Sequence, residues 1–164
     1  SHFYAKMYKK SLFEDISYPE VNYYDYFIVG YKLFEKADKV VNSYIENYCL
    51  NVDKKMFKDR ITDYDRMKKI SSCFDMLTFI EENYPRLTNF CKTKICIEAL
   101  DLFKDVKDKD YRKQLFSYVK LYRKYALHDD RIDMSKKMLC MRSMLGYHFM
   151  SLTYNTEELL RKPI

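Results

Sequence analysis

The chain has 164 residues, 48% hydrophobic and 17% aromatic, which is enough apolar material for one sizeable core and excludes a disordered chain. Its formal net charge of +6 comes from 30 basic residues interspersed with 24 acidic ones, a pattern typical of a solvated surface and not of a nucleic-acid-binding protein. The five cysteines, which form no C-x-x-C pair, argue against a disulfide framework or a zinc site and favour a reducing compartment.

The N-terminal part of the chain predicts short, mixed elements. A proline-containing turn is predicted at residues 17–20. Aromatic side chains then recur at helical spacing from Phe27 to Phe34, which predicts a helix over residues 26–37. A run of β-rich character follows over residues 39–50. This part therefore combines loop, helix and strand pieces.

From Asp65 onward the apolar residues follow a helical period. The pattern predicts one helix that is stopped by Pro85 and a second from about Leu87 to Phe103. A third helix is centred on residues 115–126 and ends at His128-Asp129-Asp130. Cys91 and Cys96, five residues apart, fall on different faces of the second helix and are expected to be buried free thiols.

A fourth helix is predicted after Asp133, which is a favourable N-cap residue. Its apolar residues share one face, and they are Met134, Met138, Met141, Leu145 and Phe149. Burial of this stripe in the core is the favoured interpretation. Because Lys136, Lys137 and Arg142 flank the stripe, a helix lying at a membrane surface remains the alternative.

Together these elements predict an α+β fold that is mainly α. A short mixed part, residues 1–60, precedes a four-helix, bundle-like region, residues 61–164, and both are expected to pack as one body. No stretch of the sequence approaches the ~18 uninterrupted apolar residues that a membrane-spanning helix needs. We therefore expect a cytoplasmic protein.

Few residues indicate chemistry on their own. Both glycines, Gly30 and Gly146, fall inside predicted helices, so no phosphate-binding loop can be built from them. The three histidines are scattered without the spacing of metal ligands. The Asp-x-Asp triplets at 63–65 and 108–110 lie at predicted helix starts, where acids stabilise the helix, and no metal site is assigned.

A longer pattern in the N-terminal part is more specific. The pattern covers residues His2–Glu20 and Tyr23–Phe27. It begins with an aromatic residue, a small residue and a lysine, and a Leu-Phe pair with two acidic residues follows. A Tyr-Pro-Glu turn and an aspartate at the start of a predicted helix complete it. This segment resembles the acceptor side of glycosyltransferase family 2, whose members have the GT-A fold. The similarity covers about fifty residues and continues loosely into Phe79–Pro85. Tyr24 stands where the family has glutamate, and Val21 where it has glycine.

The resemblance implies roles for four residues. Asp25 matches the aspartate of the family's Glu-Asp pair, and as the catalytic residue it would take a proton from the acceptor hydroxyl during inverting sugar transfer. An N-cap of the following helix is the alternative role for Asp25, and both roles are compatible. Tyr4, Lys6 and Tyr8 match residues that line the acceptor site, where the flat face of Tyr4 would suit stacking on a sugar.

The resemblance also implies partners. The family binds its nucleotide sugar and a divalent cation on an N-terminal half that precedes this segment, so we expect no cofactor in this fragment and no activity from it alone. The expected acceptor is a glycan or a lipid-linked glycan, as in polysaccharide biosynthesis, with peripheral contact at the inner membrane face. The alternative function is a non-catalytic helical module that binds a partner or a membrane surface.

Overall fold

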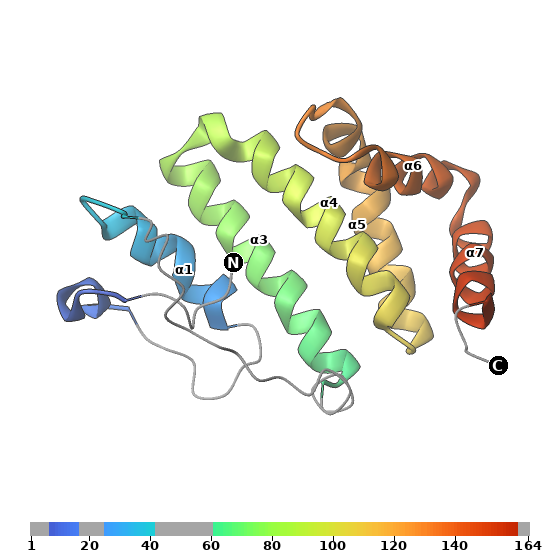
Figure 1. Ribbon diagram of the computed structural model, residues 1–164, viewed down its shortest axis with the longest axis horizontal. Coiled ribbons are helices and arrows are strands. Elements are labelled where there is room, and N and C mark those ends of the chain that lie inside the picture. The colour runs from blue at the N-terminus through green and yellow to red at the C-terminus, as the bar shows by residue number, and fades with distance from the viewer. Residues whose placement is uncertain (1–6, 17–24, 42–60, 161–164) are drawn as a thin grey trace. The chain divides into compact units, whose positions relative to one another are not determined.

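The computed structural model describes residues 7–16, 25–41 and 61–160 (Figure 1). Over these ranges the chain is helical and contains no strand, which confirms the mainly helical class. The predicted β-rich run at 39–50 lies mostly outside the described residues, and its first three residues belong to no helix or strand. Two compact units are present, Ser1–Met76 and Leu77–Ile164. The boundary predicted after residue 60 stays a prediction.

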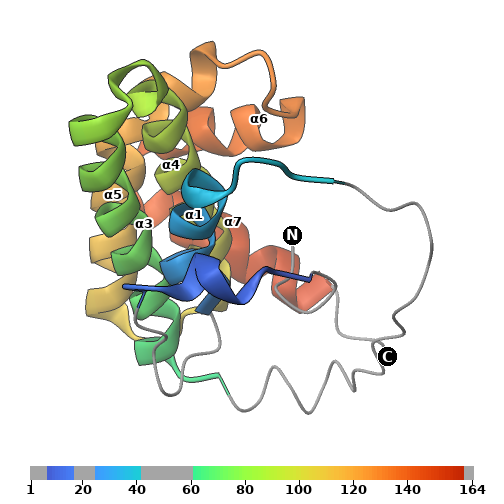
Figure 2. The same cartoon turned by 90° about the vertical axis from the view of Figure 1, so that its left-hand side faces the viewer.

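The first unit contains a single-turn 3-10 helix, η1 (Lys10–Phe13), the helix α1 (Asp25–Lys36) and most of α3 (Asp63–Asn83). Helix α1 confirms the helix predicted over 26–37. Two residues one turn apart on α1, Val29 and Leu33, are buried. η1 contacts α1, and Figure 2 shows η1 in dark blue beside this helix.

Helix α3 begins with reciprocal hydrogen bonds between a threonine and an aspartate. The carboxylate of Asp65 accepts from the backbone nitrogen of Thr62 at 3.0 Å and from its hydroxyl at 2.6 Å, while the backbone nitrogen of Asp65 donates to that hydroxyl at 3.1 Å. This is the arrangement of a capping box. The hydrogen bond from the Thr62 hydroxyl is the main cause that lowers the pKa of Asp65. The helix ends before Pro85, as predicted.

The second unit is built on α4 (Thr88–Asp105) and α5 (Lys109–His128), which pack along their lengths (Figure 1). Their shared core includes Ile95, Leu115 and Val119, all fully buried. Three residues connect the two helices. The last of them, Asp108, caps α5 by accepting hydrogen bonds from the backbone nitrogens of Asp110 and Tyr111, both at 2.9 Å.

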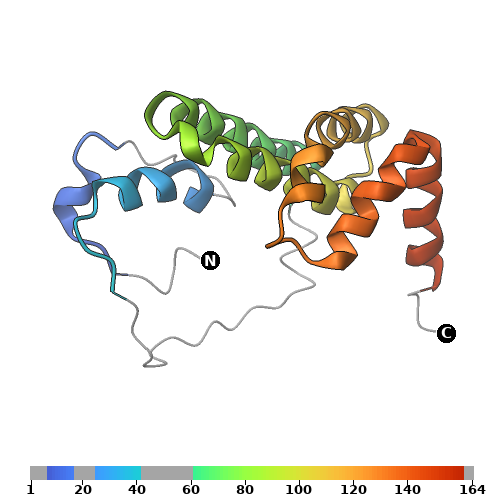
Figure 3. The same ribbon diagram turned by 90° about the horizontal axis from the view of Figure 1, so that it is seen from above.

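The prediction of a single fourth helix is wrong. The chain forms α6 (Met134–Arg142), a 3-10 turn η3 (Ser143–Leu145) and α7 (Tyr147–Leu160), and it changes direction between α6 and α7 (Figure 3). Gly146 lies at the break with φ 100° and ψ 170°, a conformation that only glycine adopts without strain. The sequence pattern missed the break because the apolar period continues through it. Asp133 precedes α6 at the N-cap position, but its side chain makes no capping hydrogen bond.

The break is held by a network of polar contacts. Arg123 on α5 donates hydrogen bonds from its guanidinium to the backbone oxygen of Ser143 at 3.0 Å and to the Ser143 hydroxyl at 3.3 Å. That hydroxyl, itself buried, donates to the backbone oxygen of Cys140 at 2.6 Å. The turn after α6 is therefore attached directly to α5.

An aromatic cluster around Phe103 joins α4 to α7. Phe103 is fully buried, and its ring lies 5.9 Å from that of Tyr147 and 5.6 Å from that of Tyr154. The guanidinium of Arg112 on α5 lies 4.5 Å from the same ring. One aromatic side chain thus contacts residues of two other helices.

The apolar stripe of the predicted fourth helix does not enter the core, contrary to the favoured interpretation. Met134, Met138, Met141, Leu145 and Phe149 are 42–68% exposed. The buried side chains of this region are instead Cys140, Ser143 and Met150. The helices α6 and α7 use other residues for packing, and the stripe faces solvent.

Candidate functional site

The structure describes only part of the predicted N-terminal site. Tyr4 and Lys6 lie outside the described residues. Asp25 is the first residue of α1, which agrees with its predicted place at a helix start, while its side chain lies outside the described part. Tyr8 lies just before η1, the turn that contacts α1. The segment that contains Tyr8 therefore contacts α1, and its hydrogen bond with Lys36 is at the end of this helix opposite Asp25.

Tyr8 is partly buried, and its ring meets the edge of Phe13 at a centroid distance of 5.8 Å and an interplanar angle of 77°. Burial raises the pKa of the Tyr8 phenol. At neutral pH the phenol is therefore protonated and can both donate and accept a hydrogen bond.

The segment around η1 has a defined backbone. The Nζ atom of Lys36, the last residue of α1, donates a hydrogen bond to the backbone oxygen of Glu14. Asp15 follows in the left-handed conformation with φ 63°, which aspartate tolerates better than most residues. The backbone nitrogen of Ile16 donates to the oxygen of Phe13 at 3.1 Å. These contacts attach the turn to the C-terminal end of α1.

The Asp-x-Asp triplets serve helix starts in the structure. Asp63 pairs with Arg66 at 3.1 Å, and Asp65 forms the cap with Thr62 described above. Asp108 caps α5, and Asp110 pairs with Lys113 at 2.9 Å. Within the described ranges, no group of three or more His, Cys, Asp or Glu residues could hold a metal ion.

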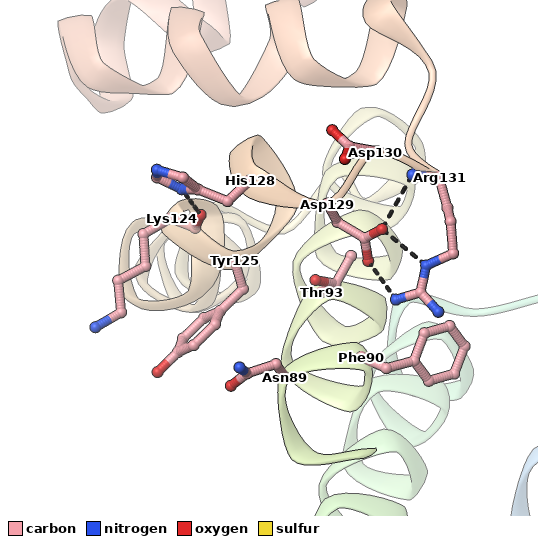
Figure 4. A pocket seen from close by; sticks show the side chains of 9 residues that line it. All are labelled: Asn89, Phe90, Thr93, Lys124, Tyr125, His128, Asp129, Asp130 and Arg131. Carbon is pink, nitrogen blue, oxygen red and sulfur yellow. Dashed lines mark hydrogen bonds and ion pairs between the residues drawn. The ribbon is translucent and has the colours of Figure 1, made fainter. Parts of the chain in front are cut away.

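A pocket in the second unit was not foreseen from the sequence (Figure 4). It has a volume of about 680 Å³ and lies where the start of α4 meets the end of α5 and the loop that follows. Its lining combines aromatic, basic, acidic and amide side chains: Asn89, Phe90, Thr93, Lys124, Tyr125, His128, Asp129, Asp130 and Arg131. In the sequence, residues 128–130 predict only a helix end, although the acidic and basic residues beside this break are a signal for a polar site.

Arg131 is fixed at one wall of this pocket. Its guanidinium forms two hydrogen bonds with the carboxylate of Asp129, from Nε at 2.8 Å and from a terminal nitrogen at 2.7 Å, and it lies 4.7 Å from the ring centre of Phe90. The bonds from Arg131 are the main cause that lowers the pKa of Asp129 to about 2. Because Asp129 stays ionised and hydrogen-bonded to Arg131, this pair stabilises the local structure of the pocket wall and does not transfer protons.

The opposite wall carries Tyr125 and His128 (Figure 4). The Tyr125 ring has the ammonium groups of Lys124 and Lys92 at 4.9 Å and 5.7 Å from its centre. His128 Nδ1 lies 2.7 Å from the backbone oxygen of Lys124. Because that oxygen only accepts, Nδ1 carries the hydrogen and donates it. The pocket thus offers aromatic faces and polar groups to a small polar ligand.

The cysteines of the second unit are buried free thiols, as expected for Cys91 and Cys96. The sulfur of Cys96 on α4 lies 3.8 Å from that of Cys140 on α6. The hydrogen bond with Cys140 and burial together raise the pKa of Cys96 above its ordinary value, and burial raises the pKa of Cys91 to about 11. Cys91 and Cys96 are therefore protonated at neutral pH, whereas the same hydrogen bond lowers the pKa of Cys140.

None of the helices in the described part has both the length and the hydropathy required to span a bilayer. In comparisons with known proteins, the chain matches no protein-family model, no curated protein and no solved structure.

Proposed function

We propose that this chain is the C-terminal part of an inverting, nucleotide-sugar-dependent glycosyltransferase, with Asp25 as its catalytic base. The observation that carries the proposal is the N-terminal pattern that ends in Asp25, together with the position of Asp25 as the first residue of α1. The acceptor would be a glycan or a lipid-linked glycan. Tyr4, Lys6 and Tyr8 would contact it.

The described packing attaches the predicted acceptor segment to α1 and sets what the acceptor must span. The turn η1 contacts α1, and Lys36 bonds to the backbone beside Asp15, so the segment that begins with Tyr8 is attached to the helix that Asp25 opens. Proton abstraction needs the base within hydrogen-bond reach of the acceptor hydroxyl. The hydrogen bond to this segment is at Lys36, and Asp25 is at the opposite end of α1, roughly 16 Å away at 1.5 Å per residue, so an acceptor would have to extend along this helix to reach the base.

The proposed reaction is a direct displacement. Asp25 takes the proton of the acceptor hydroxyl, and the hydroxyl oxygen forms a bond to the anomeric carbon with inversion. The bond from that carbon to the diphosphate breaks, and the nucleoside diphosphate leaves with the electron pair. A divalent cation would neutralise the charge that develops on the leaving group. The described residues offer no ligand set for this cation, and the proposal assigns it, with the nucleotide, to an N-terminal half.

The test begins with the native polypeptide, isolated from its source cells with an antibody against this domain. A product about twice as long as this chain, the size of two ordinary domains, supports the proposal. Sugar transfer from a panel of nucleoside diphosphate sugars is then measured with and without Asp25→Asn. We expect Asp25→Asn to reduce the rate by roughly 100-fold or more, the usual contribution of a positioned base.

Asp38→Asn is the matched control, because it removes the same charge from an exposed aspartate just after α1. It should leave transfer unchanged. Equal rates for the wild-type protein and Asp25→Asn would remove the catalytic role of Asp25. A native product of 20.1 kDa would remove autonomous catalysis altogether, because no donor-binding half would be present.

A second candidate function is a non-catalytic helical module. It is favoured by the exposed apolar residues of α6 and α7 and by the presence of Tyr24 and Val21 where the family has glutamate and glycine. The two functions differ in partner binding by Asp25→Asn and in sugar transfer. A module of this kind would bind its partner equally well with Asp25→Asn and would transfer no sugar from any donor.

A further inference from the structure

The second unit exposes large apolar side chains on three consecutive elements, α6, η3 and α7. Seven such residues are 42–68% exposed, and we refer to them as the methionine face: Met134, Met138, Met141, Met144, Leu145, Phe149 and Leu152. Scattered apolar residues on a surface need no explanation, but a grouped set of this kind indicates an interaction site.

The helices are oriented so that this face points away from the core. Met134, Met138 and Met141 are spaced by four and then three residues, which places them on one side of α6. Cys140, on the other side, is fully buried. On α7, Phe149 is exposed whereas its neighbour Met150 is buried. Exposure of the face is thus a consequence of how both helices are anchored.

The charged side chains within the span of the methionine face are all basic, although Asp133 directly precedes it and Glu157 and Glu158 follow it. Residues 134–154 contain no aspartate or glutamate, although acids make up 24 of the 164 residues, and they include Lys136, Lys137 and Arg142. Lys136 also pairs with Asp101 of α4, so part of its charge has an internal role. By sequence the span 134–154 carries a net charge of +3, which would attract an anionic surface and oppose a second copy of the same face.

We propose that the methionine face binds the surface of an anionic lipid bilayer. Apolar side chains flanked by cations are the features of a helix that lies at a membrane interface. Methionine is flexible and adapts to an irregular or fluid surface better than branched side chains do. The inference goes beyond the proposed sugar transfer and is independent of it, because lipid binding is measured without donor or acceptor.

The chain contains no tryptophan, so a single introduced tryptophan reports its own environment without background. Met138→Trp places the reporter on the methionine face. Leu121→Trp is the matched control, because Leu121 on α5 is exposed to a similar degree outside that face. Both variants are titrated with vesicles of equal parts phosphatidylglycerol and phosphatidylcholine, and with vesicles of phosphatidylcholine alone. Circular dichroism checks that each variant keeps its helices.

We expect the emission of Met138→Trp to shift to shorter wavelength on the anionic vesicles only, and that of Leu121→Trp to stay unchanged on both. Adding Lys137→Glu should weaken partitioning roughly 30-fold, since it removes one positive charge and adds one negative charge, each worth on the order of 1 kcal/mol near an anionic surface. Lys120→Glu on α5, which changes the net charge equally, should weaken it less.

Three results would overturn the proposal. The first is the absence of a shift for Met138→Trp on anionic vesicles while the helices are intact. The second is an equal shift for both reporters, which would indicate non-specific adsorption. The third is a shift that appears only on raising the protein concentration or adding an acidic protein, because either a second copy or a protein partner would then be the occupant.

Discussion

Arg131 and Asp129 form a bidentate charge pair at the wall of the pocket. Two hydrogen bonds join them, and the Phe90 ring lies against the guanidinium. The folded-state pKa of Asp129 is about 2, below its ordinary value of 3.8. A carboxyl with a lowered pKa stabilises the folded state above its unfolded pKa, and this contribution is lost as the pH falls from about 4 to about 2. Its size is small, because solvent reaches Arg131 and screens the pair.

The direction of this shift can be checked by replacing the arginine. Arg131→Met should raise the pKa of Asp129 toward 3.8, because the bonds from Arg131 are its main cause. Carbon-detected NMR titration of the Asp129 carboxyl measures the change. Lys109→Met, at the far end of α5, removes one positive charge and should leave the titration unaltered. An unchanged pKa in Arg131→Met would show that another group holds the carboxylate.

At the scale of elements, the two glycines have opposite structural roles. Gly30 lies inside α1, where no atom comes within 4 Å of an added Cβ, so Gly30→Ala should stabilise the chain by about 0.5–1 kcal/mol. Gly146 has φ 100° at the break between α6 and α7, so Gly146→Ala should destabilise it by about 1–3 kcal/mol. Urea unfolding followed by circular dichroism measures both. Equal effects of the two substitutions would contradict the roles assigned here.

These glycines also show which elements the sequence predicts well. The helices α1, α3, α4 and α5 were predicted because their apolar period or a proline defines them locally. The break at Gly146 was not, since the period of apolar residues continues across it and the contacts from Arg123 that hold it come from another helix. Asp108 and Asp133 look alike in sequence as N-caps, yet only Asp108 makes the capping bonds. Whether an aspartate at an N-cap position forms the capping hydrogen bonds thus depends on its tertiary contacts and not on the local sequence.

The site was predictable to a smaller extent. The pattern around Asp25 is local, so its place at the start of α1 followed from the sequence. The pocket of the second unit joins Asn89 and Phe90 to Arg131, residues about forty positions apart, through the packing of α4 on α5. The periodic pattern of one helix does not predict which residues of another helix it will contact. The exposure of Met134 and Met138 was missed for the same reason.

At the scale of the whole molecule, the stability of the second unit depends on Phe103. Its buried ring contacts Tyr147 and Tyr154 of α7 and Arg112 of α5. Phe103→Ala should therefore cost roughly 3–5 kcal/mol and release α7, which urea unfolding and hydrogen exchange of α7 amides would detect. Leu121→Ala removes an exposed side chain from α5 and should change stability by less than about 0.5 kcal/mol. Similar losses in both variants would contradict the central place of Phe103.

The exposure of the methionine face makes this part of the chain sensitive to peroxide. Thioethers at Met134, Met138, Met141 and Met144 are open to solvent, whereas Met150 is buried and serves as an internal reference in the same unit. Oxidation to the sulfoxide turns an apolar side chain into a polar one, and reductases reverse it. Peptide mass spectrometry should find the added oxygen on the four exposed methionines well before Met150. A surface that adheres through methionine would then lose its adhesion under oxidative stress and regain it on repair.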